Sequence, residues 1–121
     1  MQARYSQRIG VECPVMFAGD NSIGEGRILD LSLPGCLLES SEKIIEGEYV
    51  QLRLFLPDAQ TPLQVSLAAV RWVDGIRVGL EFICTSHDQQ RRLEHFVRRR
   101  LVPNGASVRN EGIEVMRAMG S

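Results

Sequence analysis

The sequence contains few cysteines, and none of them lies in a metal-binding pattern. Cys13, Cys36 and Cys84 are widely spaced, their number is odd, and no Cys-x-x-Cys pair occurs. This spacing argues against a disulfide framework and against a zinc site, so buried reduced thiols are expected. His87 and His95 are poor metal candidates, because no carboxylate lies at a suitable spacing near them.

Long apolar runs are also missing. No stretch approaches the roughly 18 consecutive apolar residues of a membrane span, and no charged-then-apolar signal peptide opens the chain. These absences predict a soluble, cytoplasmic protein that does not insert into a membrane.

Catalytic patterns are absent as well. The sequence has no Walker loop, no paired carboxylates, no cysteine in a nucleophile motif and no histidine in a predictable relation to Ser32. An enzyme is therefore the least expected class. No catalytic residue, metal or cofactor is predicted.

The composition indicates one ordinary folded domain. The chain has 121 residues, of which 44% are hydrophobic and 24% charged, and this is enough for one core. The net charge of −1 gives no overall field that would favour nucleic acid. Lys43 is the sole lysine. This excess of arginine suits recognition of anions by a planar fork of donors, but it also follows from genome composition.

Alternation of apolar and polar residues predicts several short strands. They run over about residues 11–17, 25–31, 36–39, 50–56, 65–72 and 76–82. Pro14 places the first strand at an edge or a bulge. Asp74-Gly75 is the strongest hairpin signal, and Trp72 is expected in the core. Short strands separated by turns suggest an antiparallel barrel or a sandwich.

From Ser86 the apolar residues follow a helical period. Leu93, Phe96 and Val97 form a stripe, and Ser86 followed by Gln89 resembles a capping box. A helix of about four turns should pack this stripe on the strands.

The helix is also strongly basic, and its arginines are Arg91, Arg92, Arg98, Arg99 and Arg100. Three interpretations of these arginines are open. They could form an ordinary solvated face, a surface that binds a partner protein, or a patch that binds nucleic acid. Arg100 falls within the apolar stripe, so we expect it to snorkel or to pair with an acid on the strands.

Two short motifs carry the functional interpretation. Arg4-x-x-x-Arg8 precedes the first strand, and Asp30-x-Ser32-x-x-Gly35 follows the second. Together they resemble the signature of the PilZ domain, a bacterial receptor module for the second messenger cyclic di-GMP. The hairpin formed by residues 68–72 and 78–82 resembles the closing hairpin of that family. The resemblance covers roughly residues 4–101 and implies a six-stranded antiparallel β-barrel followed by one α-helix.

The resemblance also implies a ligand site formed by Arg4, Arg8, Asp30, Ser32 and Gly35. An arginine fork matches the O6 and N7 acceptors of guanine and also grips phosphate. Asp30 can accept from guanine N–H groups or orient an arginine, and Ser32 can donate through its hydroxyl. Gly35 leaves the backbone free for a positive φ or for close approach of the ligand. The alternative to ligand binding is a purely structural role, in which the arginines are solvated and the aspartate caps its own turn.

The resemblance divides the chain into three parts. Residues 1–9 are a ligand-binding arm, residues 10–102 the barrel and helix, and residues 103–121 a tail that is flexible or a short helix. Because only three residues precede Arg4, the arm is expected to be mobile without ligand. Many family members carry a further basic residue where this chain has Ala3, which leaves open whether one ligand or a stacked pair binds.

The leading hypothesis is a receptor or adaptor that binds cyclic di-GMP, changes conformation and signals to a partner protein. The alternative is a PilZ-like adaptor that does not bind nucleotide. A third class, nucleic-acid binding by the arginine-rich helix, is not expected.

Overall fold

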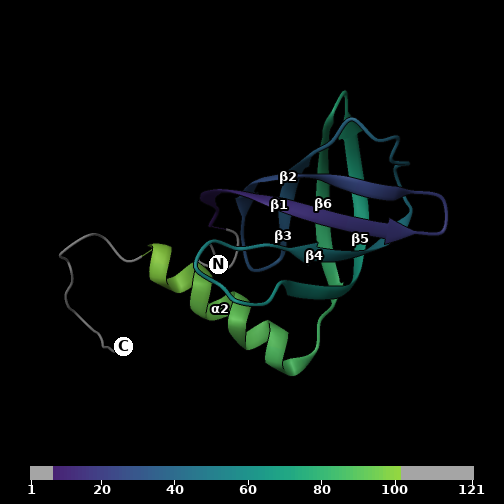
Figure 1. Cartoon of the computed structure of the whole chain (residues 1–121). Helices are drawn as coiled ribbons and strands as arrows, with labels where there is room; N and C mark the ends of the chain where they lie inside the picture. Colours follow the sequence, from purple (N-terminus) through teal and green to yellow (C-terminus); the bar gives the residue numbers. More distant parts are fainter. Residues whose placement is uncertain (1–6, 102–121) are drawn as a thin grey trace.

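Six antiparallel strands close into a barrel in the computed structural model, which describes residues 7–101 (Figure 1). The strands are β1 (Ile9–Gly19), β2 (Ile23–Leu31), β3 (Gly35–Glu39), β4 (Tyr49–Leu54), β5 (Leu63–Asp74) and β6 (Arg77–Cys84). Their order around the barrel is β1-β2-β3-β6-β5-β4, and β4 pairs with β1 to close it. A helix, α2 (His87–Leu101), follows the last strand. The expected fold is therefore confirmed, as a barrel and not a sandwich.

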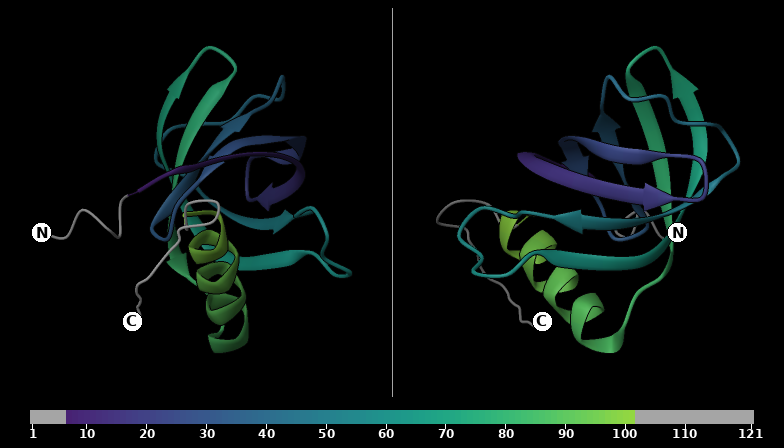
Figure 2. Two further views of the ribbon diagram at one scale, coloured as in Figure 1. Left: turned by 90° about the vertical axis from the view of Figure 1, so that its left-hand side faces the viewer. Right: turned by 45° about the vertical axis from the view of Figure 1, so that its right-hand side comes forward.

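The helix covers one end of the barrel, as both views in Figure 2 show. It packs on β5 and β1 through Leu93 and Val97, which are fully buried. The same views place the start of β1 beside the C-terminal end of α2. No helix within residues 7–101 is long and apolar enough to cross a membrane.

The start of α2 realises half of the expected capping box. The Ser86 hydroxyl accepts from the Gln89 N–H (3.3 Å), as an N-cap should. The Gln89 side chain turns away, however, and its Oε1 accepts from the backbone N–H of Gln64 (2.8 Å). The glutamine therefore ties the helix to β5 and does not close the box.

Pro14 lies at the open end of the β1–β4 pairing and directly after the irregularity of β1 between Gly10 and Cys13, which agrees with the expectation of an edge or a bulge. Its carbonyl accepts from the Phe55 N–H (2.9 Å), so its ring nitrogen also faces the β4 side. The β1–β4 ladder ends one residue later, at the Val15–Leu54 pair. Because Phe55 lies opposite Pro14, a residue with an N–H would return a second hydrogen bond to Phe55. The proline removes that bond, and the ladder ends here.

The prediction that Trp72 belongs to the core is wrong, because it ignored irregularities in β5. The register of β5 against β6 shifts between Leu67 and Ala68 and again between Val70 and Trp72. Each shift changes which face the following residues present. Trp72 is 43% exposed and lies on the outer surface over Gly79.

The turn between β5 and β6 lies one residue later than predicted. Asp74 pairs with Arg77, so the loop consists of Gly75 and Ile76. Gly75 has a φ of 64° and Ile76 has no positive φ, a combination that identifies a type II′ turn and not a type I′ turn. Ile76 belongs to the loop and not to the strand.

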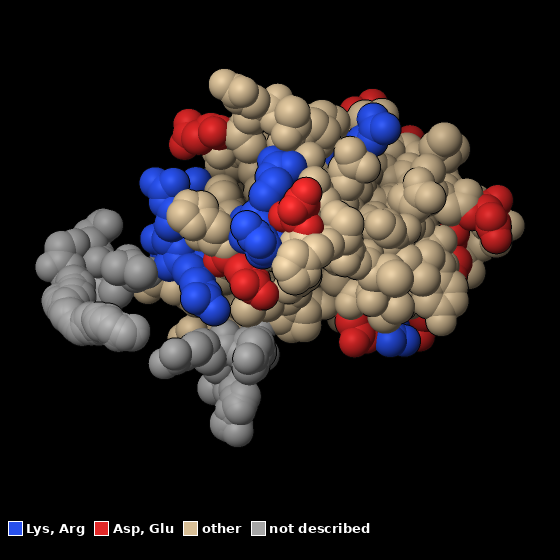
Figure 3. All heavy atoms as spheres, turned by 90° about the horizontal axis from the view of Figure 1, so that it is seen from below, with Lys and Arg blue, Asp and Glu red and all other residues tan. Residues whose placement is uncertain are grey.

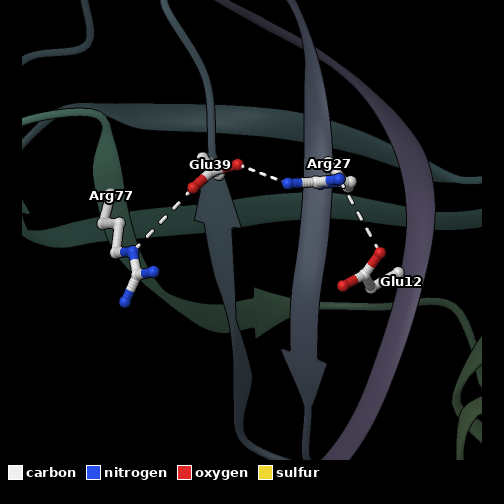
Figure 4. Close-up of polar contacts among 4 residues, drawn as sticks. All are labelled: Glu12, Arg27, Glu39 and Arg77. Atoms are coloured by element: carbon white, nitrogen blue, oxygen red, sulfur yellow. Dashed lines mark hydrogen bonds and ion pairs between the residues drawn. The ribbon is translucent and has the colours of Figure 1, made fainter.

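Paired charges cover the outer surface of β1, β2, β3 and β6 (Figure 4). Arg27 lies 2.7 Å from Glu39 and 3.7 Å from Glu12, and Glu39 lies 3.9 Å from Arg77. The hydrogen bond to Glu39, followed by the charge of Glu12, raises the pKa of Arg27. Such exposed pairs add little stability. They follow the strand register, however, so these charges are neutralised by one another.

The thiols differ in their surroundings. Cys13 and Cys36 are buried and free, and burial raises the pKa of Cys13 to about 11. Cys84 is free but exposed, so the expectation of a buried thiol is wrong there. It lies at the end of β6, where the strand leaves the barrel.

Candidate functional site

The start of β1 and the end of β2 bring Arg8 and Asp30 together. The Arg8 Nη1 atom donates to Asp30 Oδ1 at 3.0 Å across 22 residues of sequence. The Arg8 side chain is 60% exposed and the Asp30 side chain 23% exposed. This contact uses one of the five guanidinium donors, so the others remain available on the surface.

Asp30 faces outward because β2 is irregular. Ile28 and Leu31 are both fully buried, although strict alternation would place them on opposite faces. The register of β2 against β3 shifts between Ile28 and Asp30, and that against β1 shifts at the same level. Without the extra residue, Asp30 would point into the core. The irregularity therefore directs its carboxylate to the surface beside Arg8.

Ser32 closes the tight turn between β2 and β3. Its backbone N–H and its hydroxyl both donate to the Gly35 carbonyl, at 2.8 Å and 3.1 Å. The side chain is buried, and its single hydroxyl hydrogen is used in this turn. The oxygen lone pairs can still accept, so contact with a donor suits this arrangement better than the expected donation to a ligand.

Gly35 is needed for close packing of strands and not for an unusual φ. Within residues 7–101 the glycines with positive φ are Gly47 and Gly75, so that expectation for Gly35 is wrong. Gly35 pairs with Glu81, and a Cβ atom on it would overlap the Leu80 carbonyl oxygen. The Phe82 N–H also donates to the Pro34 carbonyl (2.8 Å), which fixes the turn against β6.

Asp30 also affects the thiol beneath the turn. Cys36 is buried, and its pKa is raised first by burial and then by the negative charge of Asp30. The pKa is raised further by electrostatic coupling to Cys13 when that thiol ionises. The positive charge of Arg8 acts in the opposite direction. Cys36 is therefore a protonated core residue and not a nucleophile.

Arg4 and the rest of residues 1–6 lie outside the described residues, as do residues 102–121. The predicted arm up to residue 9 is thus described only from residue 7, and the predicted tail not at all. The structure brings four of the five predicted ligand residues to one edge of the barrel. Their arrangement offers an exposed guanidinium, a carboxylate and a hydroxyl oxygen around one tight turn.

Sequence reasoning missed a groove that begins at the same edge. It has a volume of about 810 Å³ and lies between the start of β1, the loop after β4 and α2. Arg8 lines it together with Arg99 and Arg100 of α2. The motifs contain no signal for this neighbourhood, because it depends on how α2 docks against the barrel.

Comparisons with known proteins agree on one family. The family model described as the PilZ domain matches residues 2–99. The chain resembles the PilZ domain of CeSA from a cellulose-synthesizing bacterium, with a TM-score of 0.60, 22% identity, and 76% of this chain and 95% of that chain covered. It also resembles the Bacillus subtilis inhibitor of motility, MotI/DgrA, with a TM-score of 0.65, 22% identity and 88% of this chain covered. The match spans 55% of that protein. No curated protein sequence matches the chain.

Proposed function

The chain belongs to the PilZ domain family, and on this premise we propose that it is a receptor for cyclic di-GMP. PilZ domains are in general receptor or adaptor domains for this messenger and not enzymes. In the proposal, Arg4, Arg8, Asp30, Ser32 and Gly35 form the site. Binding changes the conformation at this edge of the barrel and thereby signals to a partner protein.

The Arg8–Asp30 contact carries the proposal. It joins the two motifs, which are far apart in the sequence, at one exposed point of the surface. The guanidinium can present two parallel N–H groups to guanine O6 and N7, while Asp30 can accept from the N1–H and N2 amino groups of a guanine. One arginine and one aspartate can therefore together read the Hoogsteen and the Watson–Crick edges of a guanine.

The contact is also easy to remodel. An exposed ion pair contributes about 0–1 kcal/mol, so a ligand can draw Arg8 away from Asp30 at little cost. Two phosphates and two guanines give the arginines charge-assisted and bidentate partners that are stronger than the surface pair. The change of partner supplies a local conformational response to the messenger.

The adaptor that does not bind nucleotide is the second candidate. One observation favours it: Arg8 and Ser32 already have partners within the chain, in Asp30 and in the Gly35 carbonyl. In that case the motifs serve the structure of the turn. The relatives with solved structures do not discriminate here, because at 22% identity they show only the fold.

Amide chemical shifts measured during titration with cyclic di-GMP test the location of the site. We expect the largest changes at residues 8–10 and 30–35, with little change at the opposite end of the β1–β2 hairpin, around residues 19–23. Saturable changes confined to the latter region would contradict the assignment, and no change at any residue would favour the second candidate. The expected ordering of the arm is tested by amide exchange over residues 2–10, with and without the messenger.

A further inference from the structure

The groove along α2 carries a charge pattern that the proposed messenger site does not explain. Four of its thirteen lining residues are arginines, namely Arg8, Arg92, Arg99 and Arg100, and one, Asp58, is an acid. Figure 3 views the molecule from the side of α2 and shows basic side chains gathered over one half of this face, interrupted by carboxylates. This face is basic although the chain as a whole has a net charge of −1.

The arginines of the groove differ in how far contacts within the chain already occupy them. Arg92 is fixed by the structure, since it donates to the carbonyls of Thr61 (2.6 Å) and Pro62 (3.0 Å). The Arg100 guanidinium lies 4.6 Å from the centre of the Phe96 ring, so it stacks on that ring. The expected pairing of Arg100 with an acid on the strands is therefore not observed among residues 7–101. Within residues 7–101, Arg99 and Arg100 form no ion pair.

This contrasts with the outer surface of the barrel. There Arg27 and Arg77 are paired with Glu39 across neighbouring strands. The lining of the groove also includes apolar side chains, contributed by Leu56, Pro57 and Phe96. Cations beside an apolar floor in a concave site fit a segment that supplies both carboxylates and an apolar side chain.

We propose that the α2 groove docks an acidic segment of a partner protein, with Arg99 and Arg100 binding its carboxylates. Arg92 and Arg100 are eight positions apart, about 12 Å along the helix axis at 1.5 Å per residue. An extended segment covers this distance with about four residues.

Nucleic acid and membrane fit the groove less well. The Arg100 guanidinium covers one face of the Phe96 ring, so that face is not open for stacking by a base. A bilayer surface would contact the rim of a groove and not the cations and the floor inside it.

Arg8 connects the groove to the messenger, a step that rests on the proposed function. It lines the groove and also contacts Asp30 of the messenger site. When cyclic di-GMP engages Arg8, the groove loses one cation and the messenger phosphates add negative charge at its end. The messenger therefore weakens binding of the acidic segment, and by linkage the segment weakens binding of the messenger by the same factor.

Fluorescence anisotropy with a labelled peptide of alternating glutamate and leucine tests the groove on the full chain at physiological salt. The same peptide with glutamine in place of glutamate is the probe control. Arg99→Glu/Arg100→Glu should lower the affinity about tenfold or more, because it replaces two charge-assisted contacts by repulsion between like charges. Arg91→Glu/Arg98→Glu makes the same charge change on exposed positions of the helix outside the groove, and should lower the affinity less than about threefold.

Three outcomes would overturn the proposal. The first is an equal loss in both double variants, which means that charge alone attracts the peptide. The second is no binding of the peptide by the full chain. The third is tighter binding of a thymidine oligonucleotide, or of vesicles of phosphatidylserine and phosphatidylcholine, with the same dependence on Arg99 and Arg100.

A second titration, with saturating cyclic di-GMP present, tests the coupling. The peptide affinity of the parent chain should fall severalfold. Unchanged peptide affinity, with messenger binding established separately by calorimetry, overturns the coupling. Absence of messenger binding in the calorimeter instead refutes the proposed function, and the peptide result without messenger still decides the groove.

Discussion

The guanidinium of Arg8 lies 3.0 Å from the carboxylate of Asp30, and this contact joins the two ends of the proposed messenger site. Arg8 stands just before β1, and Asp30 stands one residue before the end of β2. Because the pair is exposed, it holds both side chains near a ligand position without a large cost to separate them. The same arginine lines the groove of α2, so one residue belongs to both proposed surfaces.

Replacing Arg8 by lysine should weaken binding of cyclic di-GMP about tenfold or more. Lysine preserves the charge, but a single ammonium cannot reproduce a bidentate contact with a guanine edge, which is worth roughly 1–3 kcal/mol. Titration calorimetry measures the effect, with Arg53→Lys as a control on the exposed side of β4. Parental affinity in Arg8→Lys would mean that the site recognises charge alone.

Replacing Asp30 by asparagine should reduce messenger affinity while changing the free energy of unfolding by less than about 1 kcal/mol. The reason is that asparagine keeps the shape of the side chain and removes only an exposed ion pair. Urea denaturation and calorimetry on the same variant separate the two effects. A loss of more than about 2 kcal/mol with unchanged affinity would assign Asp30 to the structure of the turn.

Replacing Gly35 by alanine should destabilise the fold by about 1–3 kcal/mol, the usual cost of inserting an atom into a packed region. The added Cβ would overlap the Leu80 carbonyl oxygen, which belongs to the backbone of the neighbouring strand and cannot move aside alone. Gly10→Ala is the matched control, since a Cβ there meets no atom within 4 Å. Equal unfolding midpoints in urea for the two variants would refute this explanation of Gly35.

Cys13 should make the protein less stable at alkaline pH. Burial raises the pKa of its thiol from 9.0 to about 11, so the folded state favours the protonated thiol. This contribution is complete below pH 9.0 and is lost as the pH rises through about 11. Melting temperatures measured across this range should fall less steeply for Cys13→Val than for the parent. Parallel curves for the two proteins would remove Cys13 as a cause.

The sequence predicts the barrel well because alternation and turn residues act locally. Alternation located six strands, and the helical period of Leu93 and Val97 located the helix that buries them. Alternation fails where the register shifts, as at Trp72, since a strand irregularity depends on the pairing of neighbouring strands. No pattern within a single strand reports such a pairing.

The sequence singles out the residues of the candidate site but does not predict their geometry. Asp30 faces outward only because β2 has an extra residue between Ile28 and Leu31. Ser32 and Gly35 meet one another because the turn folds back, so the hydroxyl bonds to the Gly35 carbonyl. The groove depends on the docking of α2 against the start of β1, which is a tertiary contact between the two ends of the domain.

The central claim is that the site reads guanine, and calorimetric titration of the full chain with cyclic di-GMP and with cyclic di-AMP tests it most directly. Adenine carries an amino donor where guanine has the O6 acceptor, so an arginine fork loses half of its contact. We expect saturable binding of cyclic di-GMP, with affinity for cyclic di-AMP lower by about tenfold or more, and the same titration gives the stoichiometry. Equal affinity for the two dinucleotides, or no heat of binding with either, would contradict the account.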